Sequence, residues 1–264
     1  MGKKDNKNLA TLKCAGEVDY IVPEGTKTIE ECAFQSREDL MNIIIPNGVT
    51  HIELCAFEGC KNVVSVVLPD SLVYIGPAAF ASCESIESIT IPDSVKEIDD
   101  YAFSACGKLS HIKIPDSVLR MGENALGDCV KLKSAILSKN MQAVSDGLFY
   151  NCKSLVDIEV PYGFETICDN AFFGCTSLEN IEIPETIQNI LCCAFEGCTK
   201  LKSIKLPDNA DIFDEAFANC TSLEVVQLPS SIESLGQNTF AGCDNLKLLL
   251  KNGVEVKLDD LIND

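Results

Sequence analysis

One apolar pattern recurs along this chain at a fixed step of 23 residues. A phenylalanine marks the step most clearly, and it falls at Phe34, Phe57, Phe80, Phe103, Phe149, Phe172, Phe195, Phe217 and Phe240, with Leu126 in the remaining slot. The step from Phe195 to Phe217 is one residue shorter than the others. A short period that is kept this strictly predicts a solenoid, in which each repeat stacks on the next and a long surface stays open to partners.

Each repeat combines a short strand with a turn. The stretch from Ile89 to Ile91 alternates apolar and polar residues, which predicts a strand with one buried face. Pro92 follows and ends the strand, because proline has no N–H to donate to a neighbouring strand. The apolar spacing that comes next fits a helical or 3-10 turn with one face inward, and it comprises Val95, Ile98, Ala102, Phe103 and Cys106. We therefore expect an α/β repeat solenoid whose strands stack into one parallel sheet at about 4.8 Å spacing.

The repeat runs without a break from residue 17 to residue 250, so a single domain is predicted for residues 1–264. Solenoids need polar end units that cover the open ends of the core. Residues 1–16 are placed to form an N-terminal cap, and residues 251–264 are placed to form a C-terminal cap.

The pattern Leu-x-x-Ile-x-Ile-Pro-x-x-Val-x-x-Ile-x-x-x-Ala-Phe-x-x-Cys resembles the BspA-type, or Treponema-type, leucine-rich repeat. That resemblance implies a leucine-rich-repeat superhelix with a concave parallel sheet and with short helical or 3-10 turns on the convex side. It also implies a surface-exposed protein that adheres to extracellular matrix proteins. Two residues depart from the pattern, since Leu126 replaces a phenylalanine and Ser138 replaces a proline.

The formal charge of −19, from 40 acidic and 21 basic residues, argues against nucleic acid and anionic membranes as partners. No apolar run is long enough to insert into a membrane, and the first residues lack the apolar stretch of a secretory signal. The chain as given is therefore expected in the cytoplasm, with the cell surface or secretion as the alternative. The charge favours solubility and could steer a basic partner.

Fifteen cysteines are present, and nine of them share one repeat position: Cys60, Cys83, Cys106, Cys129, Cys152, Cys175, Cys198, Cys220 and Cys243. A shared repeat position predicts a stacked column of small buried side chains, whose parallel Cβ vectors suit a disulfide poorly. We expect reduced, structural thiols, which suit a reducing compartment. No Cys-x-x-Cys pair occurs, so no metal and no cofactor is expected.

The sequence offers little for catalysis. His51 and His111 are the two histidines, and they occupy different repeat positions. His111 shares its column with Ser134 and Asp157, but Asp157 is two strands away, roughly 10 Å at sheet spacing, which is too far for a catalytic triad. We expect no enzymatic activity. One catalytic alternative stays open, a thiol-dependent enzyme that would use Cys14 or the Cys192-Cys193 pair.

The outward strand positions at the N-terminal end of the sheet are unusually apolar for a solvent-facing side. The residues that we predict to bind a partner are Ile21, Met41, Ile44, Val64, Val67, Thr90, His111 and Lys113. This patch could dock a partner protein, or it could pack against a second copy of the chain in a homodimer. It could also simply reflect the preference of β-branched residues for strands. If it is an interface, lysines at positions 44 and 67 should abolish binding while the strands survive.

These observations predict a non-enzymatic protein-interaction module that binds through the concave sheet. An adhesin that binds an extracellular matrix or host protein is the interpretation that the resemblance favours. The alternative is an intracellular scaffold or a self-associating solenoid.

Overall fold

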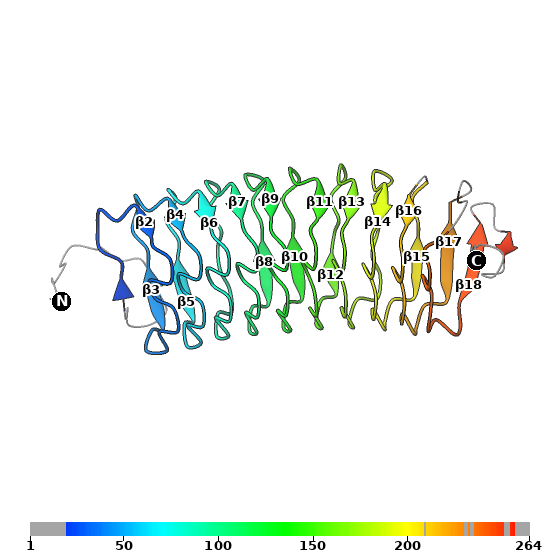
Figure 1. The fold of residues 1–264 in the computed structure, drawn as a ribbon, viewed down its shortest axis with the longest axis horizontal. Helices are drawn as coiled ribbons and strands as arrows, with labels where there is room; N and C mark the ends of the chain where they lie inside the picture. The colour runs from blue at the N-terminus through cyan, green and yellow to red at the C-terminus, as the bar shows by residue number, and fades with distance from the viewer. Residues whose placement is uncertain (1–19, 209, 230–231, 233–234, 251–253, 257–264) are drawn as a thin grey trace.

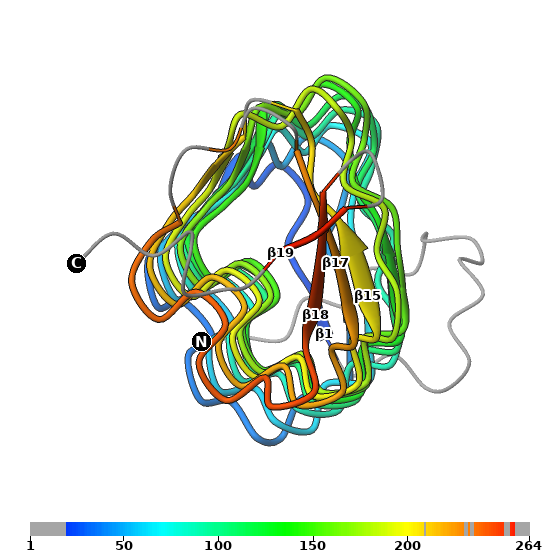
Figure 2. The same ribbon diagram turned by 90° about the vertical axis from the view of Figure 1, so that its right-hand side faces the viewer.

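The computed structural model describes residues 20–208, 210–229, 232, 235–250 and 254–256 (Figure 1). These residues form an elongated stack of coils, and each coil corresponds to one sequence repeat. Within this part of the chain every regular element is a short strand, from β1 to β19, and no helix is present. Viewed along the stack, successive coils superimpose on nearly the same outline (Figure 2).

One row of strands is the predicted parallel sheet, and we call the side that it forms the sheet face. Its members are β1 (Tyr20–Ile21), β3 (Asn42–Ile44), β5 (Ser65–Val67), β8 (His111–Lys113), β10 (Ser134–Ile136), β12 (Asp157–Ile158), β15 (Ser203–Lys205), β17 (Val225–Leu228) and β18 (Lys247–Leu250). The paired positions are one repeat apart, as in Ser134 with His111 and Ser134 with Asp157. The row falls into three groups, because the coils that contain residues 88–91 and 180–183 have no strand there.

A second row of parallel strands lies beyond the proline turn. Its members are β2 (Thr28–Ile29), β4 (His51–Ile52), β6 (Tyr74–Ile75), β7 (Glu97–Ile98), β9 (Arg120–Met121), β11 (Ala143–Val144), β13 (Thr166–Ile167), β14 (Asn189–Ile190) and β16 (Asp211–Ile212). The proline begins the turn between the rows, and its carbonyl accepts a hydrogen bond three residues on, as from Val95 N to Pro92 O at 3.1 Å. At the C-terminal end β19 (Glu255–Val256) pairs antiparallel with β18.

The predicted helical or 3-10 turns are wrong. In the phenylalanine segment, amides bond alternately to the next coil and to their own coil. Phe57 N donates to Ala79 O of the next coil at 2.8 Å, whereas Glu58 N donates to Cys55 O at 3.1 Å. Cys55 and Gly59 adopt positive φ values of 54° and 70°, and left-handed residues of this kind interrupt a right-handed helix. The segment therefore forms a series of tight turns, and half of its amides join neighbouring coils.

The inward residues form one continuous hydrophobic core, as the repeat predicts. The core cluster extends from Val22 to Cys243. Its phenylalanine rings stack from coil to coil with centroids 4.9–5.6 Å apart and planes within 17° of parallel. Stacked rings at these distances contribute favourable dispersion in addition to the burial of apolar area.

The cysteine column lies inside the core and links the coils. Each thiol donates to the carbonyl oxygen of the preceding coil's phenylalanine-slot residue, as from Cys83 Sγ to Phe57 O at 3.2 Å and from Cys106 Sγ to Phe80 O at 3.3 Å. Every described cysteine is a free thiol, and Cys14 lies outside the described residues. A thiol fits this position because it is small, largely apolar and still able to donate a weak hydrogen bond.

The two departures from the repeat are compensated locally. Leu126 stands where other coils have phenylalanine, and the next coil has Leu148 where all others except that of Thr239 have alanine. Leu126 N donates to Leu148 O at 3.2 Å, and both side chains are fully buried. Ser138, in the proline slot, is also fully buried, and its hydroxyl donates to Val118 O at 2.6 Å.

The predicted N-terminal cap, residues 1–16, lies outside the described residues, as does most of the predicted C-terminal cap, residues 251–264.

Close packing of neighbouring coils leads to a first prediction. A Cβ at Gly122 would lie 2.3 Å from Asp100 N in the adjacent coil, whereas one at Gly107 would meet nothing nearer than Glu84 O at 3.9 Å. We expect Gly122→Ala to lower the free energy of unfolding by about 1–3 kcal/mol and Gly107→Ala to leave it within about 0.5 kcal/mol. Urea denaturation of both variants checks this, and equal midpoints would contradict the tight coil contact.

The exchanged leucines lead to a second prediction. Leu126→Phe alone should overpack the core and cost about 1–3 kcal/mol, and Leu148→Ala alone should cost about 2–5 kcal/mol by leaving a cavity. The double variant restores the volumes of the other coils, so its loss should be smaller than the sum of the two. A double-mutant cycle by urea denaturation measures the difference, and strict additivity would show that the two positions do not compensate.

Candidate functional site

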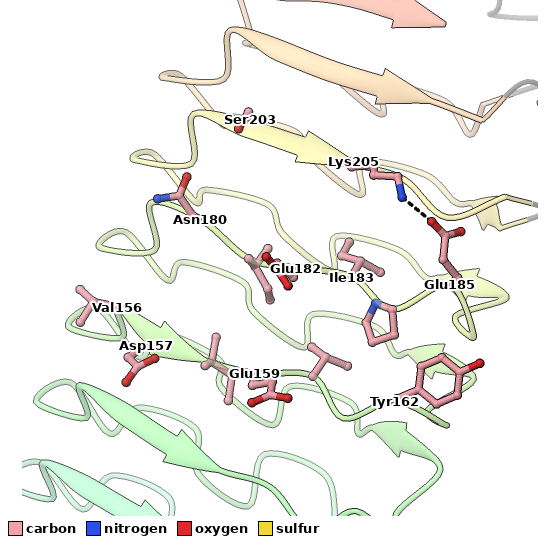
Figure 3. A pocket seen from close by; sticks show the side chains of 14 residues that line it. Val156, Asp157, Glu159, Tyr162, Asn180, Glu182, Ile183, Glu185, Ser203 and Lys205 are labelled. Carbon is pink, nitrogen blue, oxygen red and sulfur yellow. Dashed lines mark hydrogen bonds and ion pairs between the residues drawn. The ribbon is translucent and has the colours of Figure 1, made fainter. Parts of the chain in front are cut away.

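A groove crosses three coils of the sheet face between β12 and β15, and we call it the β12–β15 groove (Figure 3). Its volume is about 1050 Å³. The residues that line it are Val156, Asp157, Ile158, Glu159, Val160, Tyr162, Asn180, Ile181, Glu182, Ile183, Pro184, Glu185, Ser203 and Lys205.

The groove lies where the sheet is interrupted. Elsewhere on this face β10 pairs with both β8 and β12 in register. Between residues 157–160 and residues 180–183, all of them described, the backbone makes no hydrogen bond across the gap. Glu159 and Glu182 occupy the same position in these two coils, and like charges directly opposite each other disfavour strand pairing. Like charge is not the general cause of an interruption, because residues 88–91, with Thr90 at this position, also form no strand.

Four carboxylates give the groove a negative charge: Asp157, Glu159, Glu182 and Glu185. Lys205 is its cation, and its amine forms an ion pair with Glu185 (Figure 3). Asp157, Glu159 and Glu182 are exposed and form no ion pair with any described residue. These three charges are therefore available to a cationic ligand.

Two exposed apolar side chains flank the groove at opposite ends (Figure 3). Tyr162 is 79% exposed and Val156 is 54% exposed, which is high for side chains of their size. Tyr162 follows the strand-ending proline, where Asn47, Asp70 and Asp93 stand in other coils. Tyrosine lacks the turn-forming side chain of Asp or Asn, so the turn itself does not account for an exposed ring at this position.

The N-terminal patch predicted from the sequence is only partly exposed. Met41 is 50% exposed and Val64 is 38% exposed, and Thr90, His111 and Lys113 also face solvent. Ile21 and Val67 are half-buried and border Ile44 on both sides in the sheet register.

The expectation that Ile44 is exposed is wrong, because its side chain is 4% exposed. Part of this burial comes from its β-branched neighbours, Ile21 and Val67. By contrast, Ile136 occupies the same repeat position as Ile44 but has Lys113 and Glu159 as its neighbours, and its side chain is 61% exposed. A lysine at position 44 would bury a charge, so it would disturb the fold as well as any interface.

The histidines do not form a catalytic triad. His111 Nδ1 lies 2.7 Å from Ser134 Oγ, and Asp157 lies on the other side of Ser134. In a triad the histidine stands between the serine and the acid, which is the opposite order. His51 lies in the second row of strands, where its Nδ1 is 2.9 Å from Thr50 Oγ1.

The suspected Cys192-Cys193 pair is not activated. Burial, followed by hydrogen bonds and charges of Glu196 and Glu215, raises the pKa of Cys193 to about 12. Burial also raises the pKa of Cys192. Nucleophilic thiols have lowered pKa values, so this environment works against a thiolate.

The same residues hold the one group of metal-ligating atoms found among the described residues. Cys193 Sγ and carboxylate oxygens of Glu196 and Glu215 all lie within 4.8 Å of one another. Cys193 Sγ donates to Glu215 Oε2 at 3.6 Å, and Glu196 Oε1 accepts from Asn219 Nδ2 at 3.2 Å, so each of the three side chains already has a partner. A thiophilic divalent cation would have to displace the thiol proton to bind here.

The known sequences and structures settle the family. The sequence model described as "BspA type Leucine rich repeat region" matches residues 27–156 and 142–253 in six copies. The chain belongs to this BspA-type leucine-rich-repeat family. The resemblance inferred from the sequence is thereby confirmed. No curated protein sequence matches the chain significantly.

Several solved structures are similar to this BspA-type protein. A leucine-rich repeat protein from Bacteroides ovatus has 31% identity and a TM-score of 0.80, over 84% of this chain and 58% of that one. The leucine-rich repeat protein of T. pallidum has 32% identity and a TM-score of 0.57, over 60% of this chain and 76% of that one. The pneumococcal vaccine antigen PcpA has 24% identity and a TM-score of 0.61, over 88% of this chain and 67% of that one, and shows the fold alone. This chain therefore spans little more than half of the Bacteroides ovatus protein.

Within the described part of the chain, no helix is present that could cross a membrane.

The thiol environment leads to a third prediction. At neutral pH Cys193 should alkylate very slowly with iodoacetamide, and its rate should rise about tenfold per pH unit, because the thiolate fraction rises in that way below a pKa of about 12. Glu196→Gln with Glu215→Gln removes two negative neighbours and should speed the reaction at a given pH. Tandem mass spectrometry of the labelled peptide separates Cys193 from Cys192. Rapid labelling of the unchanged protein at pH 7 would revive the thiol-enzyme alternative.

Proposed function

We propose that this BspA-type protein is a non-catalytic binding module that holds a partner protein on its sheet face, at the β12–β15 groove. The observation that carries the proposal is the groove itself, with Tyr162 exposed at one end and unpaired backbone between residues 157–160 and 180–183. Leucine-rich-repeat solenoids generally serve as protein-interaction surfaces, and family membership supports the same class of function.

The groove has the chemistry of a polypeptide site. It offers an aromatic ring, carboxylates and free backbone groups along an open channel. Tyrosine is enriched at protein interfaces because it supplies a large contact area with one polar end. Lys205 is already neutralised by Glu185, so the free charges are all negative.

Adhesion to a host or matrix protein is the specific role that we favour. PcpA, which shares the fold, is described as a pneumococcal vaccine antigen, and an antigen of that kind is accessible to host proteins. A second candidate is an intracellular scaffold, which the free thiols of the described cysteines favour, because buried thiols suit a reducing compartment.

The N-terminal patch remains a competing location for the interface, including an interface with a second copy of this chain. Val64 is exposed there, and a hollow of about 530 Å³ borders Ile44 and Val67. An experiment on function must therefore separate this patch from the β12–β15 groove.

A capture experiment tests the proposal as a fourth prediction. The protein is immobilised and exposed separately to a mixture of matrix and plasma proteins and to a lysate of the source cells. Val156→Ser with Tyr162→Ser should abolish capture of the protein that the unchanged chain retains. Leu119→Ser is the matched control, because Leu119 is exposed to 60% but lies just before β9, off the sheet face.

Each outcome has one meaning. If the unchanged protein captures a matrix protein and only the groove variant fails to capture it, the result supports an adhesin. If the unchanged protein captures a partner only from the lysate and the groove variant fails to capture it, the result supports the scaffold. Loss in Val64→Lys with Val67→Lys, but not in the groove variant, would move the interface to the N-terminal patch. Equal capture by all variants would overturn binding through the sheet face.

A further inference from the structure

We infer that the occupant of the β12–β15 groove is an extended polypeptide segment with lysine or arginine side chains, one of which lies between Glu159 and Glu182. This inference rests on the proposed function and names the chemistry of its partner. Three features of the groove support it: its charge, its open shape across three coils and its exposed ring.

The charge of the groove selects a cation. Glu159 and Glu182 stand in the same slot of adjacent coils, and no described cation pairs with either of them. Bringing a positive group between them would turn a repulsion into two attractions. The whole-chain charge of −19 also draws basic partners and repels phosphate backbones and anionic lipid.

The shape of the groove suits an extended chain. Residues 157–160 and 180–183 make no backbone hydrogen bonds to each other, but their coils stay stacked, with the centroids of Phe149 and Phe172 5.4 Å apart. A ligand would therefore lie over the open groove and would not enter the stack as an added strand. An extended peptide can follow the groove across its three coils, and every second side chain would then face the carboxylates.

The ring of Tyr162 provides a contact that suits the same ligand. It is 79% exposed, and no described aromatic ring stacks against it. A lysine or arginine over an exposed tyrosine face gains a favourable cation–π interaction. A small inorganic cation would gain nothing comparable from Val156 at the other end, so the two flanking side chains favour a polypeptide.

A defined peptide tests the inference directly. The probes are a capped eight-residue peptide that alternates lysine with threonine, a matched peptide with glutamate in place of lysine, and spermine. Binding to the folded full chain is measured by fluorescence anisotropy of labelled peptide at low and at moderate salt. We expect the lysine peptide to bind, the glutamate peptide not to bind, and the affinity to fall as salt rises.

Charge variants locate the site. Glu159→Gln with Glu182→Gln should weaken binding of the lysine peptide at least tenfold, and Tyr162→Ala should weaken it severalfold. Asp93→Asn with Asp244→Asn is the matched control, because it removes the same charge from two exposed residues outside the groove and should change nothing. Equal urea midpoints would show that the variants are folded, and a higher midpoint for the glutamine pair would agree with relief of repulsion.

Several results would overturn the inference. If the groove and control variants weaken binding of the lysine peptide equally, the peptide is attracted by the overall negative charge of the protein and not by the groove. If spermine displaces the lysine peptide at equal concentration, and Tyr162→Ala does not weaken binding of that peptide, the groove is a simple cation site. If no lysine peptide binds but the Val156→Ser, Tyr162→Ser variant still loses its captured partner, the basic ligand is wrong and the proposed function stands. If the peptide binds in the groove and capture is unaffected, the proposed function fails instead.

Discussion

The structure depends on one constraint: each coil must present its backbone donors and acceptors where the next coil needs them. The amide of each phenylalanine-slot residue donates to the carbonyl of the residue before the corresponding slot in the next coil, as from Phe57 N to Ala79 O and from Phe172 N to Ala194 O, both at 2.8 Å. These bonds fix the register of the phenylalanine segments, and they persist where one repeat is a residue shorter, since Phe195 N donates to Ala216 O at 2.8 Å. The shorter repeat is accommodated elsewhere in the coil, because one residue fewer separates Pro207 from Ile212 than separates Pro184 from Ile190. The stacked rings and the thiol-to-carbonyl bonds follow from the same register.

The fold could be predicted because periodicity determines which residues face inward. Ile89, Ile98 and Cys106 all point into the core, as their repeat positions indicated. The form of the turns could not be predicted, since the apolar spacing of a helical turn and of a tight turn with left-handed residues is the same. Ala78 and Tyr101 adopt positive φ without being the residue types that usually signal it. At the same position only Asn124, Gly147, Asn170 and Asn238 carry that signal.

The groove was missed for a different reason. The inward residues of the interrupted coil, Ile181 and Ile183, look like those of any other repeat, so nothing in the apolar pattern indicates a gap in the sheet. The signals lay in the outward columns, where Glu159 and Glu182 follow each other and Tyr162 replaces an aspartate. Conversely, the apolar outward column suggested an exposed patch around Ile44, and burial depends on three-dimensional neighbours that a column of sequence positions does not show.

A solenoid of this kind separates stability from recognition. Its inward columns hold the register, and its outward columns are free to carry charges, rings and hollows wherever a partner requires them. In this BspA-type protein the same two glutamates border an interruption of the sheet and line the proposed groove. The groove is already formed in the unbound chain, and a preformed site reduces the entropic cost of association.

Hydrogen exchange tests this account most directly. In the free protein, the backbone amides of residues 180–183 should exchange faster than those of β10 and β17, which pair with neighbours on both sides. A bound lysine-bearing peptide should slow exchange in residues 180–183 and leave β3 and β5 unchanged. Equal protection of all strands in the free protein, or slowing confined to β3 and β5, would contradict the claim that the interrupted sheet is the binding site.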